Sequence, residues 1–196
     1  MELTGRFKEA LAYAFDLHCH QIRKGSGVPY VAHLLAVAAN VLDHGGDEEQ
    51  AIAALLHDAV EDQGGRATAA AIRERFGERV AAIVAGCTDT ELTPKPPWRQ
   101  RKEAYLAHLA HAPADVLLVS ASDKLHNARA ILADLRQVGS QVWDRFSGGR
   151  DGTLWYYRAL VTTYRAAFAA AAPERMGLID DLEQVVAEIE RRAGTA

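Results

Sequence analysis

The segment LLHDAVEDQ, residues 55–63, places side chains that could do chemistry among leucines, alanines and a valine. They form two pairs one helical turn apart, His57 with Asp58 and Glu61 with Asp62. Such an apolar stretch is expected to be buried, and a buried charge is costly unless it is paired or bound to a metal. The segment therefore indicates half of a metal site with an acid–base pair beside it.

Helix geometry places the acidic pair close to the first pair. Residues four apart lie on one face of a helix, so Glu61 is expected one turn beyond His57. In the same way Asp62 is expected one turn, about 6 Å, beyond Asp58. The acids could instead be a solvated helix end, since the sequence QGG follows them. Two acids at the negative end of a helix are unfavourable, however, which favours a functional reason for their presence.

Two further segments supply candidates for the other half of the site. PYVAHLLAVAANVL surrounds His33 with apolar residues, and ADVLLVSASDKLHNARAIL does the same for Asp123. A lone histidine on an apolar face is more often a hydrogen-bonded core residue than a ligand, whereas an aspartate inside a helix needs a partner for its charge. Together with His57 and Asp58 they would make a mixed nitrogen and oxygen set suited to Mn²⁺, Fe²⁺ or Zn²⁺.

The elements that must position these side chains are expected to be helices throughout. Apolar residues recur at helical spacing along the 196 residues, without convincing strand alternation. Thr4 is expected to cap a first helix that ends before RKGSG, and Asp47 is expected to cap the helix carrying His57. The remaining helices are expected at about 30–42, 48–62, 68–76, 78–87, 98–110, 114–136, 153–171 and 177–192.

The pattern predicts a single all-α domain, residues 1–196, of about eight to ten helices. Residues 88–98 hold three of the six prolines and are expected to form a loop, as is the glycine-rich segment 139–153. The C-terminal helix, with its tail, spans 177–196, and the tail RRAGTA is expected to be frayed. The apolar face of LVTTYRAAFAAAA, residues 160–172, could serve a homodimer as easily as a core.

Composition excludes several classes of protein. The formal net charge of −4 disfavours a nucleic-acid partner. No apolar run approaches the ~18 residues that span a bilayer, so no membrane association is expected. Cys19 and Cys87 are too few for a disulfide framework, which fits the cytoplasm.

Four motifs in order resemble a known family. The pieces HDAVED and SDKLHNAR look like the HD superfamily of metal-dependent phosphohydrolases. With HQIRKGSGVPYVAHLLAVA and GTLWYYRAL added, the chain resembles, over about residues 5–165, the hydrolase domain of RelA/SpoT homologues and most closely the stand-alone small alarmone hydrolases. The resemblance implies an all-helical fold, a Mn²⁺ ion, and removal of pyrophosphate from the 3′ position of guanosine tetra- or pentaphosphate, the alarmones of the stringent response.

The resemblance assigns roles position by position. The implied metal ligands are His33, His57, Asp58 and Asp123, and the implied catalytic acids are Glu61 and Asp62. The implied substrate contacts are Arg23, Lys24, Asn127 and a ring near Tyr156. The chain departs from many long relatives in having HLL where they have His-Pro, and RKGSG where they have a shorter loop, which bears on nucleotide selectivity.

Hydrolysis of a phosphate ester needs an activated water, charge stabilisation and a positioned phosphorus. Glu61 and Asp62 could together orient the water and accept its proton. Arg23 and Lys24 could meet the substrate's negative charges, although basic loop residues are usually only solvated. In PKPPWRQRKEAY, Lys95 and Lys102 could form the opposite wall. The sequence does not assign separate roles to Glu61 and Asp62.

Three aromatic residues lie near the end of the segment that resembles the family, and their role has two interpretations. Trp155, Tyr156 and Tyr157 lie together, and such a cluster is more often core than a ligand platform. We expect Tyr156 to contact the nucleotide. His126 is expected to be structural or exposed.

Two rival functions remain open at this point. One keeps the fold and metal but changes the substrate to another phosphorylated nucleotide or dinucleotide. The other is a non-catalytic nucleotide-binding sensor. Loop 22–29 and segment 93–102 would decide between substrates.

Overall fold

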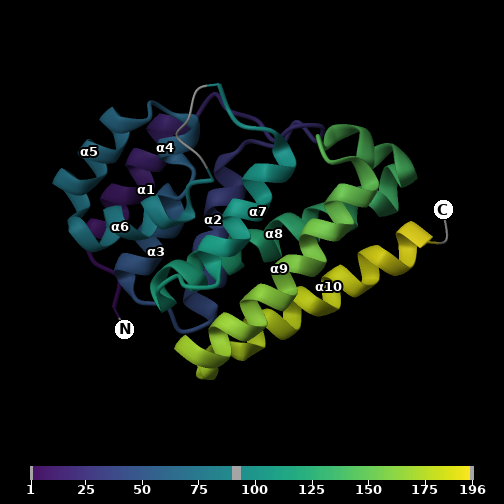
Figure 1. Cartoon of the computed structure of the whole chain (residues 1–196). Coiled ribbons are helices and arrows are strands. Elements are labelled where there is room, and N and C mark those ends of the chain that lie inside the picture. Colours follow the sequence, from purple (N-terminus) through teal and green to yellow (C-terminus); the bar gives the residue numbers. More distant parts are fainter. Residues whose placement is uncertain (1, 90–93, 195–196) are drawn as a thin grey trace.

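The computed structural model describes residues 2–89 and 94–194 and consists of helices joined by short loops (Figure 1). Over this range the only strand-like pairing is an isolated bridge between Ile22 and Pro29. The α-helices are α1 (Gly5–His18), α2 (Val31–Asp43), α3 (Glu48–Leu56), α4 (Ala59–Asp62), α5 (Arg66–Phe76), α6 (Glu78–Cys87), α7 (Trp98–Leu109), α8 (Ala114–Val138), α9 (Gly149–Ala171) and α10 (Met176–Gly194), with short 3-10 helices η1 (Gly139–Arg145) and η2 (Pro173–Arg175). The all-α prediction is confirmed.

Helix α3 lies at the centre of the N-terminal half. It contacts α1, α2, α6 and α8, and residues 51–56 are all completely buried. Its start is fixed by a capping box, in which the Gln50 backbone N–H donates to Asp47 Oδ1 and the Asp47 N–H donates to Gln50 Oε1. Because α3 is surrounded by other helices, its C-terminal end delivers His57 into the protein interior.

The prediction of one continuous helix over 48–62 is wrong. The helix ends at Leu56, and a separate four-residue helix, α4, starts at Ala59. Asp58 between them has φ −97° and ψ −4°, away from regular helix geometry. The residues at the break include no glycine or proline, so local helix propensity does not explain it. The break is instead attributed to the contacts that His57 and Asp58 make with distant parts of the fold.

The C-terminal half is built from three long helices. Helix α8 runs for 25 residues, and α10 lies along both α8 and α9 (Figure 1). The apolar side chains of segment 160–172 face this interior, since Leu160, Tyr164 and Phe168 are completely buried. The segment that could have served a dimer therefore serves the core. The homodimer stays a prediction.

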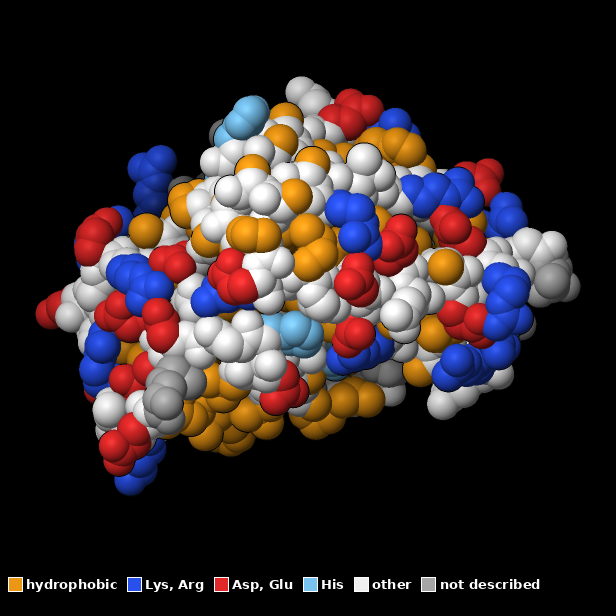
Figure 2. Space-filling model, turned by 90° about the horizontal axis from the view of Figure 1, so that it is seen from below, with side chains coloured by type: hydrophobic (Ala, Val, Ile, Leu, Met, Phe, Trp, Pro, Cys, Tyr) orange, Lys and Arg blue, Asp and Glu red, His pale blue; other side chains and the backbone are white. Residues whose placement is uncertain are grey.

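The surface over these helices carries charges of both signs. In Figure 2, which looks at the molecule from below, Lys and Arg side chains are interspersed with Asp and Glu. Ion pairs tie α10 to its neighbours, such as Arg129 with Asp181 at 3.0 Å and Arg165 with Asp180 at 2.9 Å. None of the helices described is long and apolar enough to cross a membrane.

Two segments expected to be irregular are more ordered than the sequence indicated. Segment 139–153 contains η1, and α9 begins at Gly149 rather than at residue 153. At the C-terminus α10 extends to Gly194, because the Arg150 guanidinium donates to the carbonyl of Ala193, which is buried. Of the expected loop 88–98, residues 90–93 lie outside the described residues, as do the last two residues of the tail.

Candidate metal centre and ligand cavity

The structure brings together all four side chains expected to bind metal. His33 comes from α2, His57 and Asp58 from the junction of α3 and α4, and Asp123 from α8. One ligand atom from each of His33, His57 and Asp58 lies within 4.8 Å of the others. Asp123 joins them through Oδ1, which is 3.2 Å from His33 Nε2 and 3.7 Å from His57 Nε2. Two imidazole nitrogens and two carboxylates thus face one point.

The hydrogen bonding of His57 tells which of its nitrogens is available. Nδ1 lies 2.8 Å from the carbonyl oxygen of Ala54, so Nδ1 carries the proton and donates. In the neutral ring Nε2 then bears a lone pair, and it faces Asp58 Oδ2 at 2.8 Å. This Nε2 is buried and has no hydrogen-bond partner among the described residues. A proton on Nε2 or a cation shared by the two groups would relieve this contact, and a set of two imidazoles and two carboxylates fits a divalent metal ion.

The electrostatics of the centre reflect the same need for positive charge. Burial lowers the pKa of His57, but the carboxylates of Asp58 and Asp123 outweigh burial and raise that pKa well above its usual value. Burial acts to raise the pKa of Asp58, but His57 and His33 hold it far below the usual value. Against burial, Lys124 and the two histidines likewise hold the pKa of Asp123 well below its usual value, so both carboxylates are ionised at neutral pH and favour a bound cation.

His126 supports His33 from the cavity side. The two Nδ1 atoms are 2.8 Å apart, and the pKa of His126 is lowered to about 4 by burial and by His33 and Arg23. A neutral His126 can accept the Nδ1 proton of His33, which leaves His33 Nε2 free to face Asp58 and Asp123. His126, expected to be structural or exposed, is half-buried and bonded to His33. Its position three residues after Asp123, on the same helix face as Asn127, was the signal available in the sequence.

Asp123 is held by cationic and amide donors. Lys124 Nζ donates to Asp123 Oδ2 at 2.5 Å, and the Asn127 amide donates to Asp123 Oδ1. Arg23 in turn donates to Asn127 Oδ1 at 2.8 Å. The predicted substrate residues Arg23 and Asn127 are thus linked to the metal centre by a chain of hydrogen bonds.

The structure separates the two acids of the expected catalytic pair. Asp62 lines the cavity next to His33 and accepts a hydrogen bond of 2.8 Å from the Gln21 amide. Its pKa is raised, chiefly by burial. Glu61 is instead bonded to Lys95 Nζ at 2.7 Å and lies near the backbone N–H of Asp89. Of the two, Asp62 is placed to meet a ligand.

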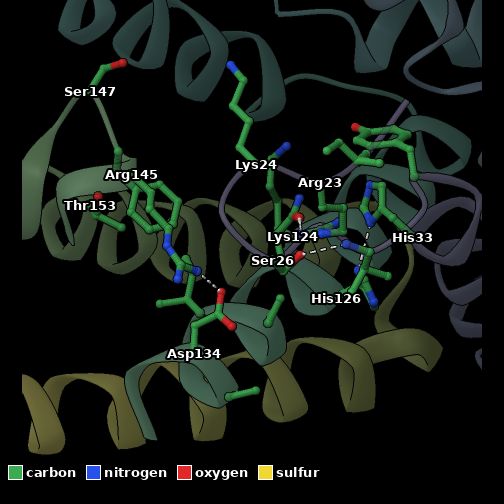
Figure 3. A pocket seen from close by; sticks show the side chains of 18 of the residues that line it. Arg23, Lys24, Ser26, His33, Lys124, His126, Asp134, Arg145, Ser147 and Thr153 are labelled. Atoms are coloured by element: carbon green, nitrogen blue, oxygen red, sulfur yellow. Dashed lines mark hydrogen bonds and ion pairs between the residues drawn. The ribbon is translucent and has the colours of Figure 1, made fainter. Parts of the chain in front are cut away.

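A cavity of about 660 Å³ opens beside the metal centre (Figure 3). This volume suits a small-molecule ligand of nucleotide size. Its walls come from the loop after α1, from α8, and from the starts of α7 and α9. The predicted substrate residues that line it are Arg23, Lys24, Lys102, Asn127 and Tyr156. Lys95 is not among the residues lining the cavity; its ammonium is paired with Glu61.

The metal end of the cavity is rich in cations. Lys124, Lys102 and Arg23 line the cavity there, with Lys124 paired to Asp123 and Lys102 paired to Asp89. The pKa of Lys102 is lowered to about 7 by burial and by repulsion from Lys124 and Arg101. Lys102 Nζ also lies 5.1 Å from the centre of the Tyr156 ring, whose side chain is mostly buried. A ligand entering here meets a concentration of positive charge next to the metal centre.

The opposite end of the cavity has a different character. Asp134 of α8 and Arg145 of η1 form an ion pair of 2.6 Å there, and Phe146 lies beside them. None of the three stands out in the sequence. For Asp134 a signal was available, because it lies eleven residues after Asp123, which is three turns along the same helix face. For Arg145 there was none, because the 3-10 helix that places it was expected to be irregular.

Comparison with known sequences adds an independent observation. A model of a family described as HD domain matches residues 10–154. A probable guanosine-3′,5′-bis(diphosphate) 3′-pyrophosphohydrolase of Synechocystis is 37% identical over 125 residues, 62% of this chain and 16% of that protein. The enzyme of that name from Aquifex aeolicus is 38% identical over 63% of this chain and 17% of its own length. The chain spans less than a fifth of these relatives.

Similar folds occur among solved structures. A structure described as a metazoan ortholog of SpoT that hydrolyses ppGpp superposes with a TM-score of 0.74 at 26% identity. The match covers 100% of this chain and 99% of that one. A crystal structure of a Listeria monocytogenes protein gives a TM-score of 0.71 at 29% identity, covering 81% of this chain and 99% of that one.

Proposed function

This chain belongs to the HD domain family, and we propose that it removes pyrophosphate from the 3′ position of guanosine tetra- and pentaphosphate. The observation that carries the proposal is the convergence of His33, His57, Asp58 and Asp123 at the end of a cation-lined cavity. The names of the Synechocystis and Aquifex relatives and of the metazoan structure support the same substrate class. We further propose that residues 1–196 form one such domain.

We propose that those four side chains hold one divalent ion, with Mn²⁺ as the first choice and Fe²⁺ or Zn²⁺ as alternatives. The orphaned Nε2 of His57 and the ionised Asp58 beside it support this assignment. When bound, the ion would supply Lewis-acid activation of water and neutralise charge on the phosphoryl group. Tyr30 would keep Asp58 in place, since its hydroxyl donates to Asp58 Oδ2 at 2.6 Å.

Asp62 is the group we propose to accept a proton from the attacking water. It lines the cavity beside His33, and its raised pKa makes it a better base than an ordinary exposed aspartate. Gln21 holds one of its oxygens and thereby fixes the direction of the carboxylate. Glu61 would act with Asp62 by holding the Lys95 ammonium and the backbone of Asp89 beside α4.

The substrate's phosphates would be bound by Arg23, Lys24, Lys102 and Lys124. An arginine fork can hold two phosphate oxygens at once, while a lysine supplies a point charge. Asn127 already accepts from Arg23 and so sets the direction of that guanidinium. Tyr156 offers a ring beside Lys102 and is our choice for a contact with the ribose or base.

A panel of nucleotides tests the proposal. The protein, reconstituted with Mn²⁺, is offered guanosine tetraphosphate, guanosine pentaphosphate and nucleotides with a single 2′- or 3′-phosphate, and released phosphate and pyrophosphate are measured separately. We expect pyrophosphate from the first two. Release of monophosphate alone would favour a phosphatase of another nucleotide, and binding without any release would favour a sensor.

A double variant tests the acid pair within that assay. Glu61→Gln with Asp62→Asn should abolish most pyrophosphate release while the protein still binds metal. Asp151→Asn is the matched control, because the Asp151 side chain is 91% exposed. Hydrolysis by the double variant at the parent's rate would show that the two acids do not handle the proton.

A further inference from the structure

The end of the cavity away from the metal centre holds a charged pair that the proposed chemistry does not use. Asp134 and Arg145 lie in the cavity wall, joined through Arg145 Nη1 and Asp134 Oδ2 at 2.6 Å (Figure 3). Their side chains are 28% and 24% exposed, so both remain accessible to a ligand. Figure 3 shows the pair on one side of the cavity and His33 with His126 on the other.

The two ends of the cavity offer a ligand different charges. At the metal end, Arg23, Lys102 and Lys124 line the cavity, and the carboxylates of Asp58 and Asp123 face the site proposed for a divalent ion. At the far end the Asp134 carboxylate offsets the charge of Arg145. A carboxylate repels phosphate, so this end is unsuited to the phosphates of a ligand. It suits a neutral group that offers hydrogen-bond donors and acceptors side by side, which is the chemistry of a nucleobase edge.

The pair is built into the fold rather than being a chance surface contact. Gly25 has φ +84°, and a Cβ atom there would overlap the Arg145 side chain. Arg145 therefore packs directly on the backbone of the loop that carries Arg23 and Lys24. The same loop thus touches both the phosphate end and the far end of the cavity, so the distance between the two ends is fixed by this contact.

Apolar side chains also line this cavity. Phe146 follows Arg145, and Ile131 and Tyr157 contribute apolar surface to the same cavity. A flat heterocycle gains stacking and burial against such surfaces. Apolar walls with one convergent charged pair are the usual composition of a site that orients a planar ligand.

We propose that Asp134 reads the guanine base of the substrate by accepting hydrogen bonds from its N1–H and 2-amino groups, with Arg145 holding the carboxylate in place. This proposal rests on the proposed function and adds the determinant of base selectivity. A carboxylate has about four acceptor sites, and Arg145 Nη1 uses one of them. Guanine presents two adjacent donors, whereas adenine places an acceptor, N1, beside its amino group and is repelled.

Substrates that differ only in the base test the proposal. The probes are guanosine 3′,5′-bis(diphosphate), its inosine counterpart, which lacks the 2-amino group, and its adenosine counterpart. We expect the wild type to have a kcat/KM about tenfold higher for the guanine substrate than for hypoxanthine, since a missing partner leaves Asp134 unsatisfied. In Asp134→Asn this preference should shrink to about twofold or less.

Controls separate base reading from a general structural effect. Asp181→Asn removes the carboxylate of another ion pair that involves α8, with Arg129, and should keep the wild-type preference. Arg145→Met should also reduce the preference for guanine over hypoxanthine, because the Asp134 carboxylate is then no longer held in place. Thermal unfolding of each variant is measured alongside, and base preference is a ratio within one protein, so partial loss of folded protein cancels.

The outcomes distinguish this proposal from the proposed function. Equal loss on the guanine and hypoxanthine substrates in Asp134→Asn, with the preference kept, would overturn base reading while pyrophosphate release stands. If the wild type released no pyrophosphate from any probe, the proposed function would fail. Base reading would then be decided by calorimetric binding of GDP, IDP and ADP, where equal affinities in the wild type would overturn it.

Discussion

The two ends of the cavity differ in how their charged groups are paired. At the metal end, His57 Nε2 and the carboxylate of Asp58 face each other with no proton donor between them in the neutral ring. At the far end, the charges of Asp134 and Arg145 satisfy each other directly. The metal end gains from an added proton or cation, as the raised pKa of His57 indicates, whereas the charges at the far end are already paired. We therefore associate the metal end with catalysis and the paired charges of the far end with binding of the ligand.

The difference also appears in how each end is held. The metal end is assembled from α2, the α3–α4 junction and α8, so it depends on the central packing of the fold. The far end is closed by a loop contact, Gly25 against Arg145. Substitutions at the metal end should therefore change catalysis by orders of magnitude, and substitutions toward the far end should change selectivity and binding by smaller factors.

The largest effect is expected from Asp58→Asn. The change removes the carboxylate that faces both histidines and should lower pyrophosphate release by about a thousandfold or more, together with bound metal. Metal analysis and initial rates on the same sample measure both. His111→Ala, at an exposed histidine, is the control that should leave both values unchanged. Near-normal metal content in Asp58→Asn would show that Asp58 is not needed to bind the metal, which would contradict the assignment of the metal end.

The next effect separates the two acids. Asp62→Asn should lower kcat by about 100- to 1000-fold, because it removes a general base that lines the cavity. Glu61→Gln should lower it by about tenfold or less, because Glu61 is engaged with Lys95. Single-turnover rates at saturating Mn²⁺ compare the variants. A larger loss in Glu61→Gln than in Asp62→Asn would reverse these roles.

A smaller effect is expected at His126, which holds the proposed metal ligand His33 in position but is not itself one of the four proposed metal ligands. His126→Phe removes the acceptor for His33 Nδ1 and should weaken Mn²⁺ binding by about 10- to 100-fold. His126→Asn keeps an acceptor and should recover part of the affinity. Calorimetric titration of metal into protein stripped of metal gives the constants, with His111→Phe as the matched control. Unchanged affinity in His126→Phe would show that His33 needs no such support.

The smallest effect concerns pH and Lys102, one of the cationic side chains at the metal end. Burial and the nearby Lys124 and Arg101 lower the pKa of Lys102 to about 7, so its ammonium is present below pH 7 and lost above it. A neutral lysine attracts phosphate less, and KM should therefore rise severalfold between pH 6 and pH 8. Lys102→Arg stays charged throughout and should flatten this rise. A KM profile identical in both proteins would remove Lys102 from phosphate binding.

Much of the metal end could be predicted from the sequence because buried charge is conspicuous in apolar segments. His33 and Asp123 stood out among alanines, valines and leucines, and the structure places both beside His57 and Asp58. The helix break at His57–Asp58 could not be foreseen, since neither glycine nor proline marks it. It follows from the contacts of Asp58 with His33 and Tyr30, which lie far away in the sequence.

The far end was less accessible to sequence reasoning. Asp134 and Arg145 are charged residues in a polar stretch, and nothing local distinguishes them from solvated surface residues. Their pairing depends on a 3-10 helix that glycine content made appear irregular, and on the backbone of Gly25 more than a hundred residues earlier. The pairing of Lys95 with Glu61 was hidden for a related reason, because this acid comes from α4, which is distant in the sequence.

The most direct test of the metal-dependent reaction is phosphorus NMR of guanosine 3′,5′-bis(diphosphate) incubated with the protein. Samples contain chelator, chelator followed by excess Mn²⁺, or Mn²⁺ with the His57→Ala variant. The account predicts intact pyrophosphate and GDP only in the wild-type sample with Mn²⁺ restored. Pyrophosphate release that persists in chelator, or that His57→Ala retains in full, would contradict it.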